Sequence, residues 1–135
     1  MTILPDANIL IAYFDNIEPI ASLVEQFILR RKIIFSVVCV AEFLIKASPE
    51  QTRLVHDITG ELGIAFIDRV ILDQAVEYRK QSLRKSKKAY LLDCFIAATT
   101  KVHRATLVTL DRADYPFSNL TVKQPDELFK SNISR

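Results

Sequence analysis

The chain alternates short apolar segments with longer amphipathic ones, and this alternation restricts the possible folds more than any other feature. The short segments are typical of buried strands and are expected at 2–4, 33–36, 64–67, 106–110 and 120–122. Helices are expected at 8–14, 20–28, 38–47, 50–59, 70–83, 89–103 and from 126 onward. Strands joined by helices run parallel, and right-handed crossovers place the helices on both faces of the sheet. The sequence therefore predicts an α/β fold with a five-stranded parallel sheet flanked by helices.

Size and composition narrow the class of protein further. The 135 residues are expected to form one domain, 1–135, and half of them are apolar, as in ordinary globular proteins. The net charge of +2 is too small to indicate the chemistry of a partner. Because no apolar run reaches the roughly 18 residues of a membrane span, we expect no membrane segment and a cytoplasmic location.

The small numbers of glycines and cysteines exclude several kinds of binding site. Gly60 and Gly63 are the only glycines and cannot form a glycine-rich phosphate loop, so no nucleotide cofactor is expected. Cys39 and Cys94 are too few for a disulfide framework and lack the spacing of a zinc site. We expect both cysteines to be reduced and buried.

Several acids stand alone beside apolar residues. Asp6, Glu42 and Asp93 are each the only charge in an apolar stretch, and Asp111 follows the apolar run 105–110. An unpaired carboxylate in such surroundings must find a partner, bind a cation or take up a proton. Parallel sheets bind ligands at the carboxyl ends of their strands, where Asp6 and Asp111 are expected. We therefore predict that the four acids converge on Mg²⁺ or Mn²⁺, which prefer oxygen ligands and can activate water against a phosphoryl group.

Each acid also has a simpler interpretation. Asp6 could be the N-cap of the helix that follows it, and Asp93 could interact with the dipole at the start of its helix. Glu42 could reach solvent from the edge of an apolar stripe, and Asp111 could cap a turn. These alternatives remain open for each residue, and the shared placement of the four favours the metal site.

Four motifs resemble those of the PIN-domain family, and within it the VapC-like toxins of type II toxin–antitoxin systems. They are PDAN at 5–8, VAEFL at 40–44, LLDCFIAAT at 91–99 and VTLDRADY at 108–115. Their order and spacing match the family, although Tyr115 stands where Phe is commoner. The resemblance implies a PIN-like three-layer sandwich with the strand order 3-2-1-4-5.

The resemblance also implies a metal-dependent endoribonuclease that hydrolyses RNA phosphodiester bonds with Mg²⁺ or Mn²⁺. The positions that match the family's site are Asp6, Glu42, Asp93 and Asp111, the secondary candidate Asp114, and the supporting Asn8 and Thr109. It further implies homodimers and a small antitoxin. We expect the antitoxin to insert an Arg into the acidic cleft and to lay a helix in a groove near Phe14, Ile20, Val24 and Phe43.

A basic run precedes the helix that carries Asp93. It contains Arg84, Lys85, Lys87 and Lys88. Charge runs are usually solvated helix ends, but beside an acidic site these side chains could hold RNA phosphates.

Two other functions remain open at this stage. Asp6, Asp68, Thr109 and Lys123 are expected near successive strand ends and could imitate the site of a phospho-accepting receiver domain, which would leave Glu42 and Asp93 unexplained. A PIN-like module that binds RNA or protein without cutting is the second alternative.

Overall fold

The computed structural model describes residues 1–85 and 89–133, and a parallel sheet lies at its centre. The described strands are β1 (Ile3–Pro5), β2 (Thr106–Val108) and β3 (Val122–Lys123). Their order is β1-β2-β3, with Leu4 beside Leu107 and Leu107 beside Val122. The parallel pairing places the carboxyl ends of β1 and β2 at one edge of the sheet.

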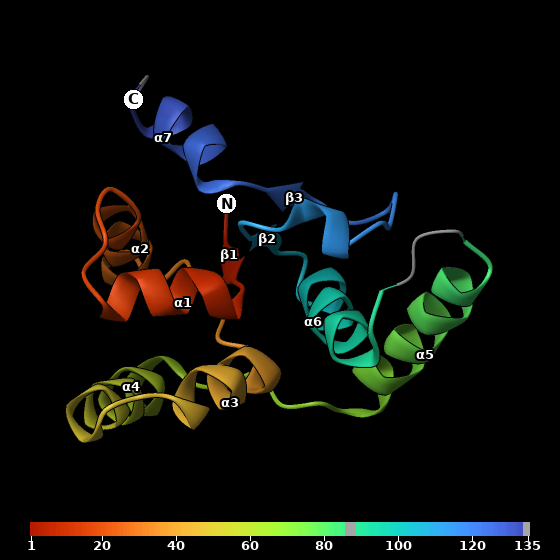
Figure 1. Cartoon of the computed structure of the whole chain (residues 1–135), viewed down its shortest axis with the longest axis horizontal. Helices are drawn as coiled ribbons and strands as arrows, with labels where there is room; N and C mark the ends of the chain where they lie inside the picture. The colour runs from red at the N-terminus through yellow and green to blue at the C-terminus, as the bar shows by residue number, and fades with distance from the viewer. Residues whose placement is uncertain (86–88, 134–135) are drawn as a thin grey trace.

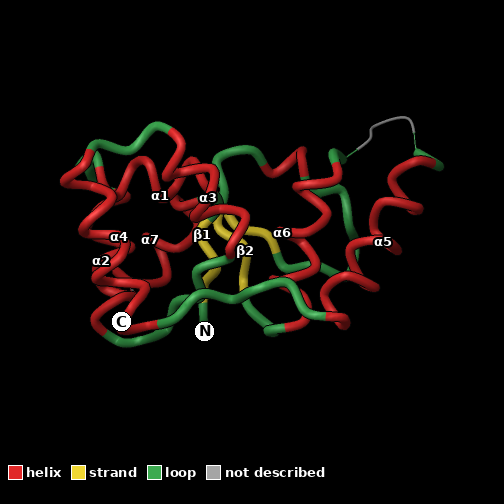
Figure 2. The backbone as a smooth tube through the Cα atoms, turned by 90° about the horizontal axis from the view of Figure 1, so that it is seen from below, coloured by secondary structure: helices red, strands yellow, loops and turns green. Residues whose placement is uncertain are grey.

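Helices flank this sheet on both sides. In chain order they are α1 (Ala7–Phe14), α2 (Ile20–Leu29), α3 (Val37–Ile45), α4 (Pro49–Leu62), α5 (Arg69–Leu83), α6 (Leu91–Val102), the 3-10 turn η1 (Arg112–Asp114) and α7 (Pro125–Ile133). Figures 1 and 2 show α1, α2 and α4 on one side of the strands and α5 and α6 on the other. Helix α3 contacts both α1 and α6, and α7 returns to α2. The predicted α/β class with helices around a parallel sheet is confirmed.

The sheet is smaller than the sequence predicts. In the part of the chain that the structure describes, segments 33–36 and 64–67 form isolated parallel bridges, from Ile33 to Ile3 and from Ser36 to Ala65, instead of strands. Pairing ends early because the chain turns into α3 at once: the Ser36 Oγ accepts the Cys39 N–H at 3.1 Å and caps this helix. Three of the five predicted strands are thus confirmed, and the five-stranded order is not.

Side-chain caps set the starts of two helices. Ser48 and Gln51 form a capping box at α4, with Ser48 Oγ 3.0 Å from the Gln51 N and Gln51 Oε1 3.2 Å from the Ser48 N. Asp68 caps α5 by accepting the Ile71 N–H at 2.9 Å. Each cap satisfies a backbone donor that has no partner within the helix, a contribution of about 1 kcal/mol.

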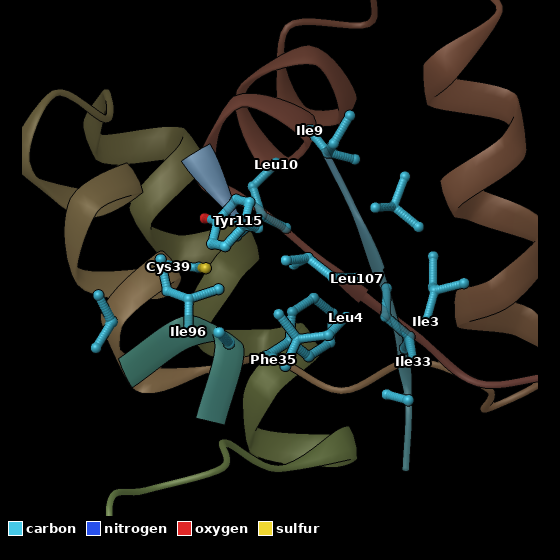
Figure 3. Close-up of a cluster of buried hydrophobic side chains, with 14 of the residues drawn as sticks. Ile3, Leu4, Ile9, Leu10, Ile33, Phe35, Cys39, Ile96, Leu107 and Tyr115 are labelled. Carbon is cyan, nitrogen blue, oxygen red and sulfur yellow. The ribbon is translucent and has the colours of Figure 1, made fainter. Parts of the chain in front are cut away.

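The core lies between the sheet and its helices. Ile3, Leu4 and Leu107 of the strands are fully buried, and Figure 3 shows Leu10 and Ile96 packed with them. Cys39 and Cys94 are free and buried, as predicted. None of the described helices is both long enough and apolar enough to span a membrane.

Three residues other than glycine have a φ in the left-handed region, which suits glycine better: Asn16, Arg31 and Arg104. Arg104 follows α6 with φ 54°, in the left-handed region, where the Ala105 N–H reaches back to the Thr100 carbonyl at 3.0 Å. Such helix ends usually carry glycine, because a Cβ is strained there. We expect Arg104→Gly to raise the free energy of unfolding by about 0.5–1 kcal/mol, measured by urea denaturation. Arg104→Ala removes the same charge but keeps a Cβ, so equal stability of the two variants would contradict the backbone explanation.

Candidate functional site

Asp6 lies where β1 ends and α1 begins, and it is almost fully enclosed by hydrogen-bond donors. Its side chain is 8% exposed. Oδ1 accepts the Ala7 N–H at 2.8 Å, which makes Asp6 the N-cap of α1. Oδ2 accepts the hydroxyls of Thr109 and Tyr115, each at 2.8 Å. The N-cap interpretation is therefore correct, and the same carboxylate also joins β1 to the segment that follows β2.

Two further acids approach Asp6 from other elements. On α3, partial burial and the charge of Asp6 raise the pKa of Glu42. In the first turn of α6, partial burial and the charges of Asp114, Asp6 and Glu42 raise the pKa of Asp93 to about 6, although the Tyr90 backbone N–H acts in the opposite direction. Since like charges have this effect only over short distances, we call Asp6, Glu42, Asp93 and Asp114 the acidic cluster.

Asp111 and Asp114 both lie in the fourth motif, but they interact with different residues. Turn η1 folds Asp114 back, with its N–H 3.0 Å from the Asp111 carbonyl, and Asp114 is the acid with the largest effect on Asp93. Asp111 is held instead by Asn8, whose Nδ2 donates to Asp111 Oδ2 at 3.3 Å. The Thr109 hydroxyl connects Asp6 to Asp111, because it donates to Asp6 and accepts the Asp111 N–H at 3.0 Å. The predicted supporting residues Asn8 and Thr109 therefore do lie among the predicted acids.

The chemistry of these donors fits a hard divalent cation. Carboxylate oxygens are the ligands that Mg²⁺ and Mn²⁺ prefer, and a bound cation would relieve the repulsion that raises the pKa values of Glu42 and Asp93. Within residues 1–85 and 89–133, no three side chains of Asp, Glu, His or Cys stand close enough together to enclose an ion.

The basic run is only partly described. Arg84 is the exposed C-cap of α5. The Lys85 Nζ donates to the Pro116 carbonyl at 2.7 Å and lies 6.0 Å from the centre of the Phe117 ring. Lys85 thus ties the end of α5 to the loop that follows Asp114. Lys87 and Lys88 lie outside the described residues.

Two residues of the site were missed in the sequence. The Tyr115 hydroxyl contacts Asp6, and burial and the Asp6 charge raise the pKa of Tyr115 far above its usual value. The Cys39 Sγ lies 3.9 Å from Asp6 Oδ1, and burial raises the pKa of its thiol well above the usual range. A signal was present for Tyr115: a tyrosine where phenylalanine is commoner adds a hydroxyl that needs an acceptor when buried.

The receiver-like interpretation loses two of its four residues. Asp68 is a helix cap. Lys123 has an acid partner of its own, because its Nζ lies 3.5 Å from a carboxylate oxygen of Glu127. Asp6 and Thr109 remain, and they contact each other within the site already described.

Comparison with known proteins shows the family. A sequence model described as the PIN domain matches residues 3–121, and the chain belongs to this family. The predicted resemblance is thereby confirmed. No curated protein matches the sequence.

Several solved structures share the fold of this chain. VapBC2 from Rickettsia felis, bound to a DNA fragment from its promoter, has a TM-score of 0.76 and 18% identity, covering 92% of this chain and 98% of that one. DNA-bound VapBC from Salmonella typhimurium has a TM-score of 0.75 and 17% identity, with the same coverage. A toxin–antitoxin complex from Klebsiella pneumoniae has a TM-score of 0.69 and 20% identity, covering 89% of this chain and 96% of that one. At these identities the likeness establishes a common fold.

The raised pKa of Asp93 predicts a pH dependence of stability. In the folded protein Asp93 retains its proton up to about pH 6, whereas the unfolded chain releases it near the ordinary value of 3.8. The folded state therefore binds more protons between these values, and its stability falls as the pH rises through this window. We expect Asp93→Asn to flatten this fall and to raise the free energy of unfolding at pH 7 by on the order of 1 kcal/mol in chelator, after allowance for solvent screening.

The measurement is urea denaturation of both proteins from pH 4 to pH 8. Asp57→Asn serves as the control, because Asp57 is exposed on α4 and is not among the charges that act on Asp93. A wild-type stability that rises steadily from pH 4 to pH 7, with the same profile in Asp93→Asn, would show that Asp93 is not destabilised by its neighbours.

Proposed function

We propose that this protein is a divalent-metal-dependent endoribonuclease and the toxin of a toxin–antitoxin pair. The observation that carries the proposal is the acidic cluster, in which carboxylates from β1–α1, α3, α6 and η1 influence one another at the carboxyl edge of a PIN-domain sheet. Such a concentration of like charge is unfavourable unless a cation binds there. The toxin assignment is supported by the common fold with a toxin–antitoxin complex.

The residues of the site divide into fixed and adjustable groups. Asp6 is the fixed group, because donors from three segments hold both of its oxygens. Glu42 and Asp93 would be the adjustable ligands, and Asp114 or Asp111 would complete the set. Asn8 and Thr109, which contact each other, would orient Asp111. A bound Mg²⁺ or Mn²⁺ would lower the pKa of a water molecule and polarise the phosphoryl oxygen that it attacks.

RNA binding requires positive charge beside this negative site. Arg84 and Lys85 are described at the end of α5, and Lys85 contacts the loop that follows Asp114. We propose that they and the neighbouring Lys87 and Lys88 hold phosphates on either side of the scissile bond. A cytoplasmic location and a homodimer belong to the same proposal.

The antitoxin is proposed to bind a groove next to α1. A hollow of about 400 Å³ lies between α1, α2 and α4, lined by Tyr13, Phe14, Asn16, Glu18, Ala21, Ser22, Glu25, Leu54 and Ile58. Of the four residues expected there from the sequence, Phe14 lines this groove. Ile20 is partly buried against the core and is not part of the lining, and Val24 and Phe43 are 1% and 4% exposed and belong to the core. The lining contains two acids and no base, so the partner segment should be apolar with a cationic side chain.

The first test is RNA cleavage with and without Mn²⁺. We expect the wild type to cut RNA only with the ion, and Glu42→Gln or Asp93→Asn to lower kcat/KM by at least roughly 100-fold, since each removes a metal ligand. Asp111→Asn should cost less, because Asp93 feels the charge of Asp114 and Asp114 could take the place of Asp111. Cleavage is followed on a fluorescently labelled RNA.

Glu77→Gln is the matched control, because Glu77 is exposed on α5 and is absent from the charges that act on Asp93. It should keep wild-type activity. Full activity in Glu42→Gln would remove that residue from the site, and RNA binding without Mn²⁺-dependent cleavage by the wild type would favour a non-cleaving RNA-binding module.

A second test concerns the groove. Leu54 is 45% exposed in the groove lining. We expect Leu54→Lys to weaken binding of the antitoxin encoded beside this protein by at least roughly tenfold, because it places a charge in an apolar contact, while RNA cleavage stays unchanged. Calorimetry measures the affinity. Leu83→Lys, at a residue 53% exposed on α5, is the control and should bind normally; equal weakening by both variants would place the antitoxin elsewhere.

A further inference from the structure

We propose that Tyr115 is a positioning residue of the acidic cluster, whose hydroxyl fixes the Asp6 carboxylate before a metal ion binds. This inference rests on the proposed function, because it assigns Asp6 the role of first ligand. It adds a residue that contacts neither the ion nor the RNA and acts only through Asp6.

The hydrogen bond from Tyr115 to Asp6 is short and buried, and its acceptor oxygen receives a second hydroxyl. Tyr115 is 4% exposed, and its hydroxyl donates to Asp6 Oδ2 at 2.8 Å. The Thr109 hydroxyl donates to the same oxygen at 2.8 Å, and the Ala7 N–H donates to the other oxygen. Oδ1 also lies 3.9 Å from the Cys39 Sγ, a weaker donor, so the two hydroxyls on Oδ2 and the Ala7 N–H on Oδ1 are the strong contacts that define the rotation of the carboxylate about its last bond. Thr109 alone would leave that rotation less restricted.

The Tyr115 ring is itself held in a rigid setting. Figure 3 shows it in the core cluster with Leu10 and Cys39. Its backbone N–H donates to the Arg112 carbonyl at 3.0 Å, and its carbonyl accepts the Phe117 N–H at 2.9 Å. A hydroxyl on a ring fixed at both the backbone and the side chain is a preorganised donor.

Asp6 needs this support because it forms no ion pair with a described cation. Among the ion pairs of residues 1–85 and 89–133, none includes Asp6. Its charged neighbours are the acids Glu42 and Asp93, which repel it. Hydrogen bonds to a carboxylate are roughly twice as strong as those between neutral groups, so loss of the phenolic donor should release Asp6 from its present orientation.

Direct titration with Mn²⁺ measures the consequence, with RNA absent. We expect Tyr115→Phe, which removes only the hydroxyl, to raise the Kd for Mn²⁺ roughly five- to tenfold by calorimetry, the effect of one charge-assisted hydrogen bond in part replaced by water. Thr109→Val should act in the same direction. An unchanged Kd in Tyr115→Phe would overturn the proposal.

The chain offers a matched control. Tyr78 is also buried, and its hydroxyl donates to Asn119 Oδ1 at 2.8 Å, away from the acids. Tyr78→Phe should lower the thermal midpoint about as much as Tyr115→Phe and leave the Kd for Mn²⁺ within twofold of the wild-type value. Equal loss of Mn²⁺ affinity in both variants would mean that the Tyr115 hydroxyl acts through general stability alone.

A second measurement needs neither metal nor RNA. In chelator, the change in unfolding free energy caused by Tyr115→Phe is compared in the wild-type and Asp6→Asn backgrounds. If the hydroxyl anchors the Asp6 charge, the change should fall to half or less in Asp6→Asn, whereas equal changes would overturn the proposal. If the wild type binds no Mn²⁺, the metal-dependent function fails, and this cycle still decides whether Tyr115 anchors Asp6.

Discussion

The carboxylate of Asp6 is the contact on which the rest of the site depends. It ends β1, caps α1 and accepts hydroxyls from two residues that follow β2. A buried carboxylate is stable only when donors replace the water it has lost. Because those donors come from segments more than 100 positions away, the charge of one residue requires that β1, α1 and the chain after β2 meet at one edge of the sheet.

The acids around Asp6 oppose the stability of the fold that holds them. Partial burial and mutual repulsion raise the pKa values of Glu42 and Asp93. The surrounding scaffold tolerates this cost because its strands and helices are tightly buried, with Ile3, Leu107 and Ile96 almost inaccessible to solvent. Unfavourable charge supported by a rigid core is typical of a site that binds a cation or a polar substrate.

The proposed antitoxin groove and the acidic cluster share α1. Asp6 of the cluster caps the start of this helix, and Tyr13 and Phe14 at its end line the groove. Gln51 connects α4 to the end of α1, since its Nε2 donates to the Phe14 carbonyl at 3.3 Å and to Asp15 Oδ1 at 2.8 Å. A partner that binds the groove therefore lies along the same rigid helix as the site.

The sequence by itself determined the α/β class and most of the helices, and it singled out Asp6, Glu42 and Asp93 as isolated acids, because periodicity and isolated charges are local features of a chain. It did not determine which acid approaches Asp93, since that depends on the fold of η1, nor the length of the pairing at 33–36, where Ser36 begins a helix. The burial of Val24 and Phe43 and the contact of Tyr115 with Asp6 were likewise decided only by tertiary packing. A pattern along one segment records what that segment must bury, whereas the partner of a buried group is chosen by segments far away in the sequence.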